Sequence, residues 1–243
     1  MAITRPTVLE PWNPTAEWGT TEKRRYSIGV DRGMLYLDGV GVPWTGLVSV
    51  NRKAGDGETR KRYVDGRLYR VDVSPTDYAA TVKAFTYPDE FEQCLGNLSP
   101  DGTALTAHGQ PGRSFGMSYR TLSGDGEGHA QHYKIHLVYD SVAEESDFES
   151  ASINDSPELS PFEFNITGIP IDAAGLRPTS YFSIDSRDLA PITLRGLENS
   201  LYGRAGSTPT IPPIAEIRAY LAEYATELPG FGVSPFGSTP FGY

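Results

Sequence analysis

Apolar and polar residues alternate along several short segments of this chain. In residues 161–169, Phe162, Phe164 and Ile166 are each separated by one polar residue. Successive side chains of a β-strand point to opposite faces, so this pattern predicts a strand with one buried and one exposed face. Runs of apolar, β-branched and aromatic residues predict further strands elsewhere. These segments are residues 78–86, 113–121, 132–140 and 179–185.

Asp-Gly dipeptides punctuate the same part of the chain. Both central residues of a type I′ turn need positive φ, which Asp and Gly tolerate, so Asp-Gly between apolar runs predicts a tight hairpin. Residues 33–50 are predicted to form two strands joined at Asp38-Gly39, and RKRYV and RLYRVDV form a hairpin around Asp65-Gly66. The polar residues 51–60 predict an exposed loop between long strands. Asp-Gly also occurs at Asp56-Gly57, Asp101-Gly102 and Asp125-Gly126.

Three segments have a helical pattern. Residues 87–96 begin with acidic residues, end at a glycine, and place Phe91, Cys94 and Leu95 on one face. Residues 197–203 predict a short helix. Residues 212–230 have an apolar stripe between prolines and predict a C-terminal helix over 213–228. Many short strands with a few helices predict an all-β fold, either a sandwich or a barrel.

The two ends of the chain differ from the strand-rich part, which is predicted to form one β domain over residues 25–230. Residues 1–24 contain three prolines and no sustained periodicity, and we expect an arm whose Trp12 and Trp18 pack on this subunit or on a neighbour. Residues 231–243 repeat Phe-Gly, which indicates a tail that docks into pockets of another subunit or a terminus with fortuitous spacing.

Charge is distributed unevenly along the chain. The net charge is -10, which argues against ordinary nucleic-acid binding because that requires a basic surface. Residues 1–70 have 12 Lys+Arg and 8 Asp+Glu, a balance of +4, and residues 71–243 have 9 and 23, a balance of -14. The asymmetry is compatible with head-to-tail self-association, whereas the simpler interpretation is an acidic surface that maintains solubility.

The sequence offers little enzymatic chemistry. It contains no GxSxG, Walker or HExxH motif, and Cys94 is expected to be a core residue rather than a nucleophile. His132 and His136 lie four apart on a predicted strand with Glu127 nearby, but the remaining ligands of a closed metal site are missing. No stretch approaches the roughly 20 apolar residues of a membrane span. We therefore expect no catalytic residue, no cofactor, no metal and no membrane contact.

An ordered series of sequence blocks resembles a known family. The blocks are WTGLVSVNRKAGDGE, YVDGRLY, SPTDYAATVKAFTYPDEFEQCLG, GQPGRSFGMSYRT, YKIHLVYD, FEFNITGIP and LENSLYG. In this order and spacing, over residues 25 to 215, they resemble the major tail proteins, or tail tube subunits, of long-tailed phages that infect actinobacteria. The Phe-Gly tail is not part of that pattern.

The resemblance implies a fold and a mode of assembly. The fold would be a β-sandwich or partly closed barrel with a long β-hairpin and a flanking helix. Six copies would form a ring, and rings would stack head to tail into a tube that conducts DNA during ejection without binding it specifically. Partners would be the tape-measure protein, the tail terminator and the tail-tip proteins, with assembly in the host cytoplasm and a final place in the virion tail.

The expected subunit interface combines the arm, the 51–60 loop and the Phe-Gly tail. Its residues are Trp12, Trp18, Asn51, Arg52, Lys53, Asp56, Glu58, Phe231, Phe236 and Phe241. Two other classes of protein share this composition and strand content. One is a different virion protein, such as a decoration, baseplate or adhesin protein, and the other is a carbohydrate-binding β-sandwich module or hydrolase.

Overall fold

The computed structural model describes seven stretches of the chain. They are residues 26–53, 59–73, 78–100, 104–124, 130–146, 160–173 and 175–224.

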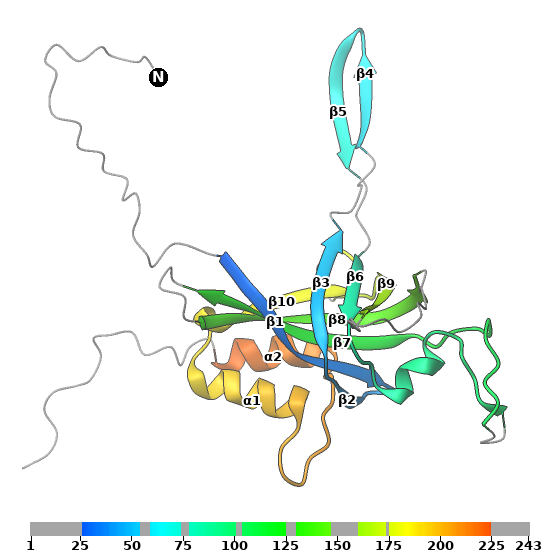
Figure 1. Ribbon diagram of the computed structural model, residues 1–243. Helices are drawn as coiled ribbons and strands as arrows, with labels where there is room; N and C mark the ends of the chain where they lie inside the picture. The colour runs from blue at the N-terminus through cyan, green and yellow to red at the C-terminus, as the bar shows by residue number, and fades with distance from the viewer. Residues whose placement is uncertain are drawn as a thin grey trace, which may run out of the picture.

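Eight strands form one antiparallel sheet in the order β2-β1-β7-β8-β9-β6-β3, with β10 also paired to β8 (Figure 1). Two more strands, β4 and β5, form a separate two-stranded sheet. The predicted all-β fold with minor helices is confirmed. The strands are β1 (Tyr26–Leu37), β2 (Val40–Trp44), β3 (Leu47–Lys53), β4 (Thr59–Val64), β5 (Arg67–Val73), β6 (Ala79–Ala84), β7 (Phe115–Gly124), β8 (Ala130–Glu145), β9 (Phe162–Gly168) and β10 (Tyr181–Asp185).

The long strand β8 divides the large sheet into two halves. Along one edge it pairs with β7, and along the other it pairs first with β10, through residues 134–138, and then with β9, through residues 141–145. Beyond β9 the sheet continues through β6 to β3, which packs back against β1 without a hydrogen-bonded ladder. The sheet is therefore strongly curled, and it does not close into a barrel.

An aromatic core fills the concave side of the curled sheet. Phe91 is fully buried, and its ring lies 4.6 Å from Trp44, 5.0 Å from Phe164 and 5.4 Å from Phe115. Phe164 has the alternating position predicted for a buried face, and Phe91 comes from the short 3₁₀ helix η2 (Asp89–Gln93). Edge-to-face aromatic contacts add to the stabilisation that burial already provides.

Two helices cover the other side of the sheet and bury a second core. They are α1 (Pro191–Tyr202) and α2 (Ile214–Tyr224), below the sheet in Figure 1. Tyr36 is 2% exposed, and its hydroxyl donates to the carbonyl of Leu201 at 2.9 Å and lies 3.0 Å from Ser118. This hydroxyl is satisfied in the core, which is the condition for burying it without loss of stability.

Two of the predicted hairpin turns have the predicted geometry. Asp38 and Gly39 have φ of 50° and 81°, and Asp65 and Gly66 have φ of 49° and 71°. Positive φ at both central positions is what a type I′ turn requires. The other three Asp-Gly dipeptides, Asp56-Gly57, Asp101-Gly102 and Asp125-Gly126, lie outside the described residues.

Several predicted boundaries are wrong. Residues 33–50 contain parts of three strands, because the chain turns again at Gly46, whose φ is 82° and where a Cβ would lie 2.5 Å from Thr86 Oγ1. The predicted helix at 87–96 is the shorter η2, which is followed by Gly96 at φ 76°. The helix predicted at 197–203 begins earlier, at Pro191, since proline is well suited to the first turn.

The C-terminal helix predicted over 213–228 is described as α2 between Ile214 and Tyr224. The arm at 1–24 and the tail at 231–243 lie outside the described residues.

Candidate assembly surfaces

The β4–β5 hairpin stands away from the rest of the molecule as a sheet of its own (Figure 1). Each side chain from Lys61 to Arg70 is exposed. The apolar residues among them include Tyr63 at 61% exposure and Tyr69 at 77%. An isolated two-stranded hairpin is marginally stable in water, so this element lacks the support that the rest of the fold has.

The strand register assigns the hairpin residues to two faces. Tyr63 pairs with Leu68, and Val64 pairs with Arg67, which places these two pairs on opposite faces. A shift of register between Arg62 and Tyr63 marks a β-bulge. Each face of the hairpin therefore presents an apolar side chain next to basic ones.

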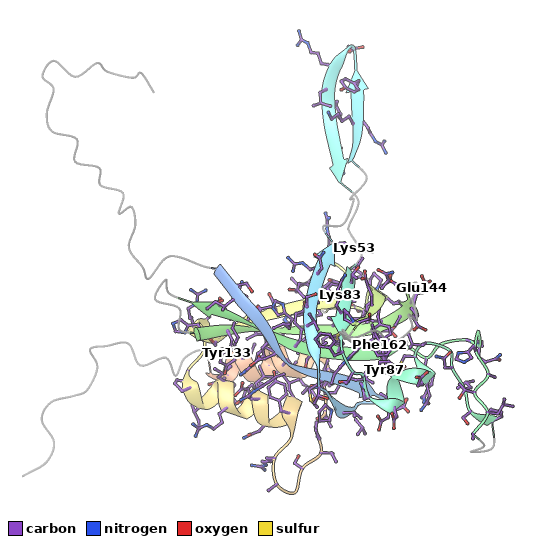
Figure 2. The ribbon with its side chains drawn as sticks, in the orientation of Figure 1. Lys53, Lys83, Tyr87, Tyr133, Glu144 and Phe162 are labelled. Atoms are coloured by element: carbon purple, nitrogen blue, oxygen red, sulfur yellow. The ribbon has the colours of Figure 1, made fainter. Side chains whose placement is uncertain are left out.

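Three of the predicted interface residues lie at the end of β3 that leads to the hairpin. Asn51, Arg52 and Lys53 are exposed as predicted, but they belong to β3 and not to a loop, and the predicted loop at 51–60 also overlaps the start of β4. Lys53 lies at the end of β3 (Figure 2), and its Nζ donates to Asn165 Oδ1 at 3.1 Å. The Arg52 guanidinium lies 4.9 Å above the centre of the Tyr181 ring. These two cations therefore contact β9 and β10, strands that do not pair with β3, and they form the root of the hairpin.

Beneath Arg52 lies a stack of aromatic rings that crosses the sheet. The His136 ring stacks on Tyr119 at 4.5 Å and lies 5.9 Å from Tyr181, which stacks on Tyr78 at 5.0 Å. Tyr78 directly precedes β6, and the other three residues lie on β7, β8 and β10. The stack therefore joins both halves of the sheet. The hairpin root therefore packs, through Arg52, on this aromatic stack.

The imidazole of His136 is fully hydrogen-bonded within this stack. Its Nδ1 lies 2.7 Å from the Tyr181 hydroxyl, and its Nε2 lies 2.8 Å from Thr121 Oγ1. Burial, with smaller contributions from Arg52 and Lys134, lowers the pKa of His136 to about 4. The ring is therefore neutral at neutral pH, and its role in the described structure is packing and hydrogen bonding.

The histidine pair considered as metal ligands does not form a ligand set in the described part of the chain. His136 is buried whereas His132 is exposed. Glu127 lies outside the described residues, and no group of three His, Cys, Asp or Glu side chains suited to a metal is found within them. Cys94 is 1% exposed, and burial raises the pKa of its thiol to about 12, as expected for a core residue.

Sequence reasoning missed a buried arginine that ties helix α1 to the sheet. Arg120 is 8% exposed and donates to both carboxylate oxygens of Asp31, at 2.9 and 2.7 Å, and to Glu198 Oε1 at 3.1 Å. Its guanidinium lies 4.2 Å above the Tyr133 ring, whose hydroxyl also donates to Glu198. The three partners come from different elements, so sequence spacing gave no signal for the cluster.

The other predicted interface residues lie outside the described part of the chain. They are Trp12, Trp18, Asp56, Glu58, Phe231, Phe236 and Phe241. Residues 59–73 were predicted as a hairpin but not as part of the interface, and they have the most exposed aromatic side chain of the described structure, Tyr69. Within the described stretches, no helix has both the length and the apolar character needed to cross a membrane.

Comparison with known proteins finds no matching family model and no matching curated protein. Two solved structures of an extracellular contractile injection system are similar. One, the PVC sheath/tube terminator in the extended state, is 11% identical, covers 65% of this chain and 97% of its own, and has a TM-score of 0.35. The other, the PVC sheath-tube complex in the extended state, is 10% identical, covers 70% and 99%, and has a TM-score of 0.37. Similarity at this level does not assign a function to the chain.

Proposed function

We propose that this protein is a structural, non-enzymatic subunit that assembles with copies of itself into the tube of a phage tail. In this proposal, hexameric rings stack head to tail around a tape-measure protein, and the finished tube conducts DNA during ejection. Tail terminator and tail-tip proteins would bind the two ends of the tube. The ordered sequence blocks that resemble tail tube subunits support the proposal.

The observation that carries the proposal is the exposure of the β4–β5 hairpin. Tyr63, Val64, Leu68 and Tyr69 are each at least half exposed on an element that has no core of its own. Apolar side chains gathered on an exposed element mark a site of protein contact. A partner that covers this hairpin would supply the burial that the single subunit does not.

The edges of the large sheet support self-assembly as well. Among the described strands, β3 and β10 each pair with a single neighbouring strand. Unpaired edges expose backbone N–H and C=O groups that readily accept another strand. In a ring of copies, pairing between such edges would join the curled sheets into one continuous barrel.

The overall charge fits a conduit for DNA. The chain has a net charge of -10. A surface of this sign repels phosphate groups, so nucleic acid would pass along it without adhering.

Electron microscopy of the purified full-length chain tests the proposal. In negative stain, the protein should form rings or hollow tubes of uniform diameter as its concentration rises. A chain that stays monomeric at the highest attainable concentration, in low and in physiological salt, would contradict the proposed function.

A further inference from the structure

The hairpin is basic in a strongly acidic protein. Residues 59–73 contain five Lys or Arg and two Asp, a balance of +3, whereas the whole chain has a net charge of -10. Lys61 and Arg67 lie on opposite faces near the tip, and both are exposed. The remainder of the molecule therefore offers many complementary acidic groups, and the hairpin has the sign to bind them.

An acidic and aromatic surface lies where β6 leads into η2. The ring of Tyr87 packs against Phe162 (Figure 2), with 5.1 Å between the ring centres, and its hydroxyl donates to Glu92 at 2.7 Å. Tyr87 and Phe162 are half-buried, whereas Asp89 and Glu145 are exposed. We call these five residues, Tyr87, Asp89, Glu92, Glu145 and Phe162, the Tyr87 patch.

The acidic groups of the patch all lie close enough to Tyr87 to affect the pKa of its hydroxyl. Burial raises the pKa of the Tyr87 hydroxyl, and its bond to Glu92 and the nearby charges of Glu145 and Asp89 raise it further. Among the residues that the structure describes, no Lys or Arg forms an ion pair with Asp89 or Glu145. Two exposed carboxylates that no described Lys or Arg pairs with, beside half-buried rings, suit a ligand with cationic, aromatic and aliphatic groups.

The hairpin and the Tyr87 patch lie at opposite ends of one strand pair. Strand β3 ends at Lys53 on the side of the hairpin, and β6 starts from that side at Ala79 and ends at Ala84, three residues before Tyr87 (Figure 1). Phe162 pairs with Ala84, at the patch end. Because the two surfaces differ and lie at opposite ends, a contact between them in two copies leaves a free hairpin and a free patch, and it can repeat.

We propose that the β4–β5 hairpin of one copy docks on the Tyr87 patch of the next copy. Arg67 and Val64 form a cross-strand pair on one face of the hairpin, and this face lies against the Tyr87 patch, with Arg67 near its carboxylates and Val64 on its rings. Lys61, on the other face, adds to the positive charge that attracts the acidic patch. This contact rests on the proposed self-assembly and names the two surfaces that carry it. The occupant of the patch is a second copy of this chain, because the chain itself has both the basic hairpin and the acidic patch.

Charge reversal in the full-length chain tests the contact. The variant Lys61→Glu/Arg67→Glu and the variant Asp89→Lys/Glu145→Lys should each weaken self-association at least about tenfold in low salt, measured by sedimentation velocity. Combining all four substitutions should restore association. Mixing the two double variants should also restore association, because each hairpin then meets a patch of opposite charge on the other variant.

Matched controls change the same charge elsewhere. Arg195→Glu/Arg204→Glu and Asp172→Lys/Glu216→Lys alter exposed residues on the side of the helices and should leave association unchanged. Circular dichroism melting of each variant verifies that the body remains folded, since none of the substituted side chains is buried.

The outcomes separate this contact from the proposed function. If wild type assembles and the reversed variants assemble equally well, the contact is wrong and self-assembly stands. If wild type never associates, both proposals fail. If wild type instead binds duplex DNA at physiological salt, and the Lys61→Glu/Arg67→Glu variant does not, the hairpin is a nucleic-acid contact and the docking proposal is overturned.

Discussion

The curled body and the β4–β5 hairpin are built from similar residues but are stabilised differently. In the body, Phe91 and Phe164 are fully buried against other rings. In the hairpin, Tyr63 and Tyr69 are more than half exposed, although tyrosine and phenylalanine have similar size and strand preference. The body therefore buries its aromatic side chains within the single subunit, whereas the hairpin would gain such burial only from a partner.

Truncating a body aromatic should have the largest effect. Phe91→Ala removes a ring that contacts Trp44, Phe115 and Phe164, and it should lower the free energy of unfolding by about 4 kcal/mol. Tyr69→Ala in the hairpin is the matched control and should change it by less than about 0.5 kcal/mol. Urea denaturation measures the free energy of unfolding of the two variants. A similar decrease in both would contradict the claim that the body, and not the hairpin, is stabilised by buried aromatic side chains.

Acid should weaken the body through His136. The folded pKa is about 4 and the ordinary value is 6.5, so the unfolded chain binds a proton between these pH values and the folded chain does not. Stability is therefore complete above pH 6.5 and declines as pH falls to 4, by about 3 kcal/mol for this group. Urea unfolding at pH 7 and at pH 4.5 should show a smaller pH effect in His136→Gln than in wild type. Equal pH effects in the two proteins would mean that His136 is not buried in its neutral form.

Removing the buried arginine should have a somewhat smaller effect. Arg120→Met leaves Asp31 and Glu198 without their shared partner, and we expect a loss of about 2 kcal/mol because Asp31 is partly exposed and screened by water. Adding Glu198→Gln should recover part of that loss. Thermal or urea unfolding of the single and double variants measures the coupling, and strictly additive losses would show that the cluster does not act as a unit.

Two glycines in left-handed turns sharpen the comparison further. At Gly46 a Cβ would lie 2.5 Å from Thr86 Oγ1, so Gly46→Ala should destabilise the body by about 2 kcal/mol. At Gly66, the hairpin tip, no atom lies within 4 Å of such a Cβ. Gly66→Ala should therefore leave unfolding of the body unchanged, as measured by urea denaturation. Loss of body stability in Gly66→Ala would mean that the hairpin is part of the cooperative fold.

Local signals in the sequence predict many strands and turns of the body, but few of the contacts between segments that are distant in sequence. Alternation at Phe162, Phe164 and Ile166 is sufficient to predict β9 and its buried face, and Asp-Gly chemistry predicts the turns at Asp38 and Asp65. The third strand within residues 33–50 was missed because the turn at Gly46 depends on contacts with Thr86, far along the chain.

The candidate assembly surfaces were predicted only in part. Arg52 and Lys53 were expected at an interface from the resemblance to tail tube subunits, and the structure places both at the root of the hairpin. The exposure of Tyr63 and Tyr69 could not be anticipated, because in sequence they have the alternation of a strand that belongs to a core. The grouping of Tyr87, Glu145 and Phe162 depends on pairing between strands that are distant in sequence.

Hydrogen exchange measured by mass spectrometry, on the full-length chain before and after assembly, tests most directly whether the hairpin needs a neighbouring copy. In the single subunit, amides of β4 and β5 should exchange rapidly while those of β7 and β8 are protected. In the assembled state, β4 and β5 should become protected, and β7 and β8 should change little. Hairpin amides that exchange equally fast in both states would contradict the account.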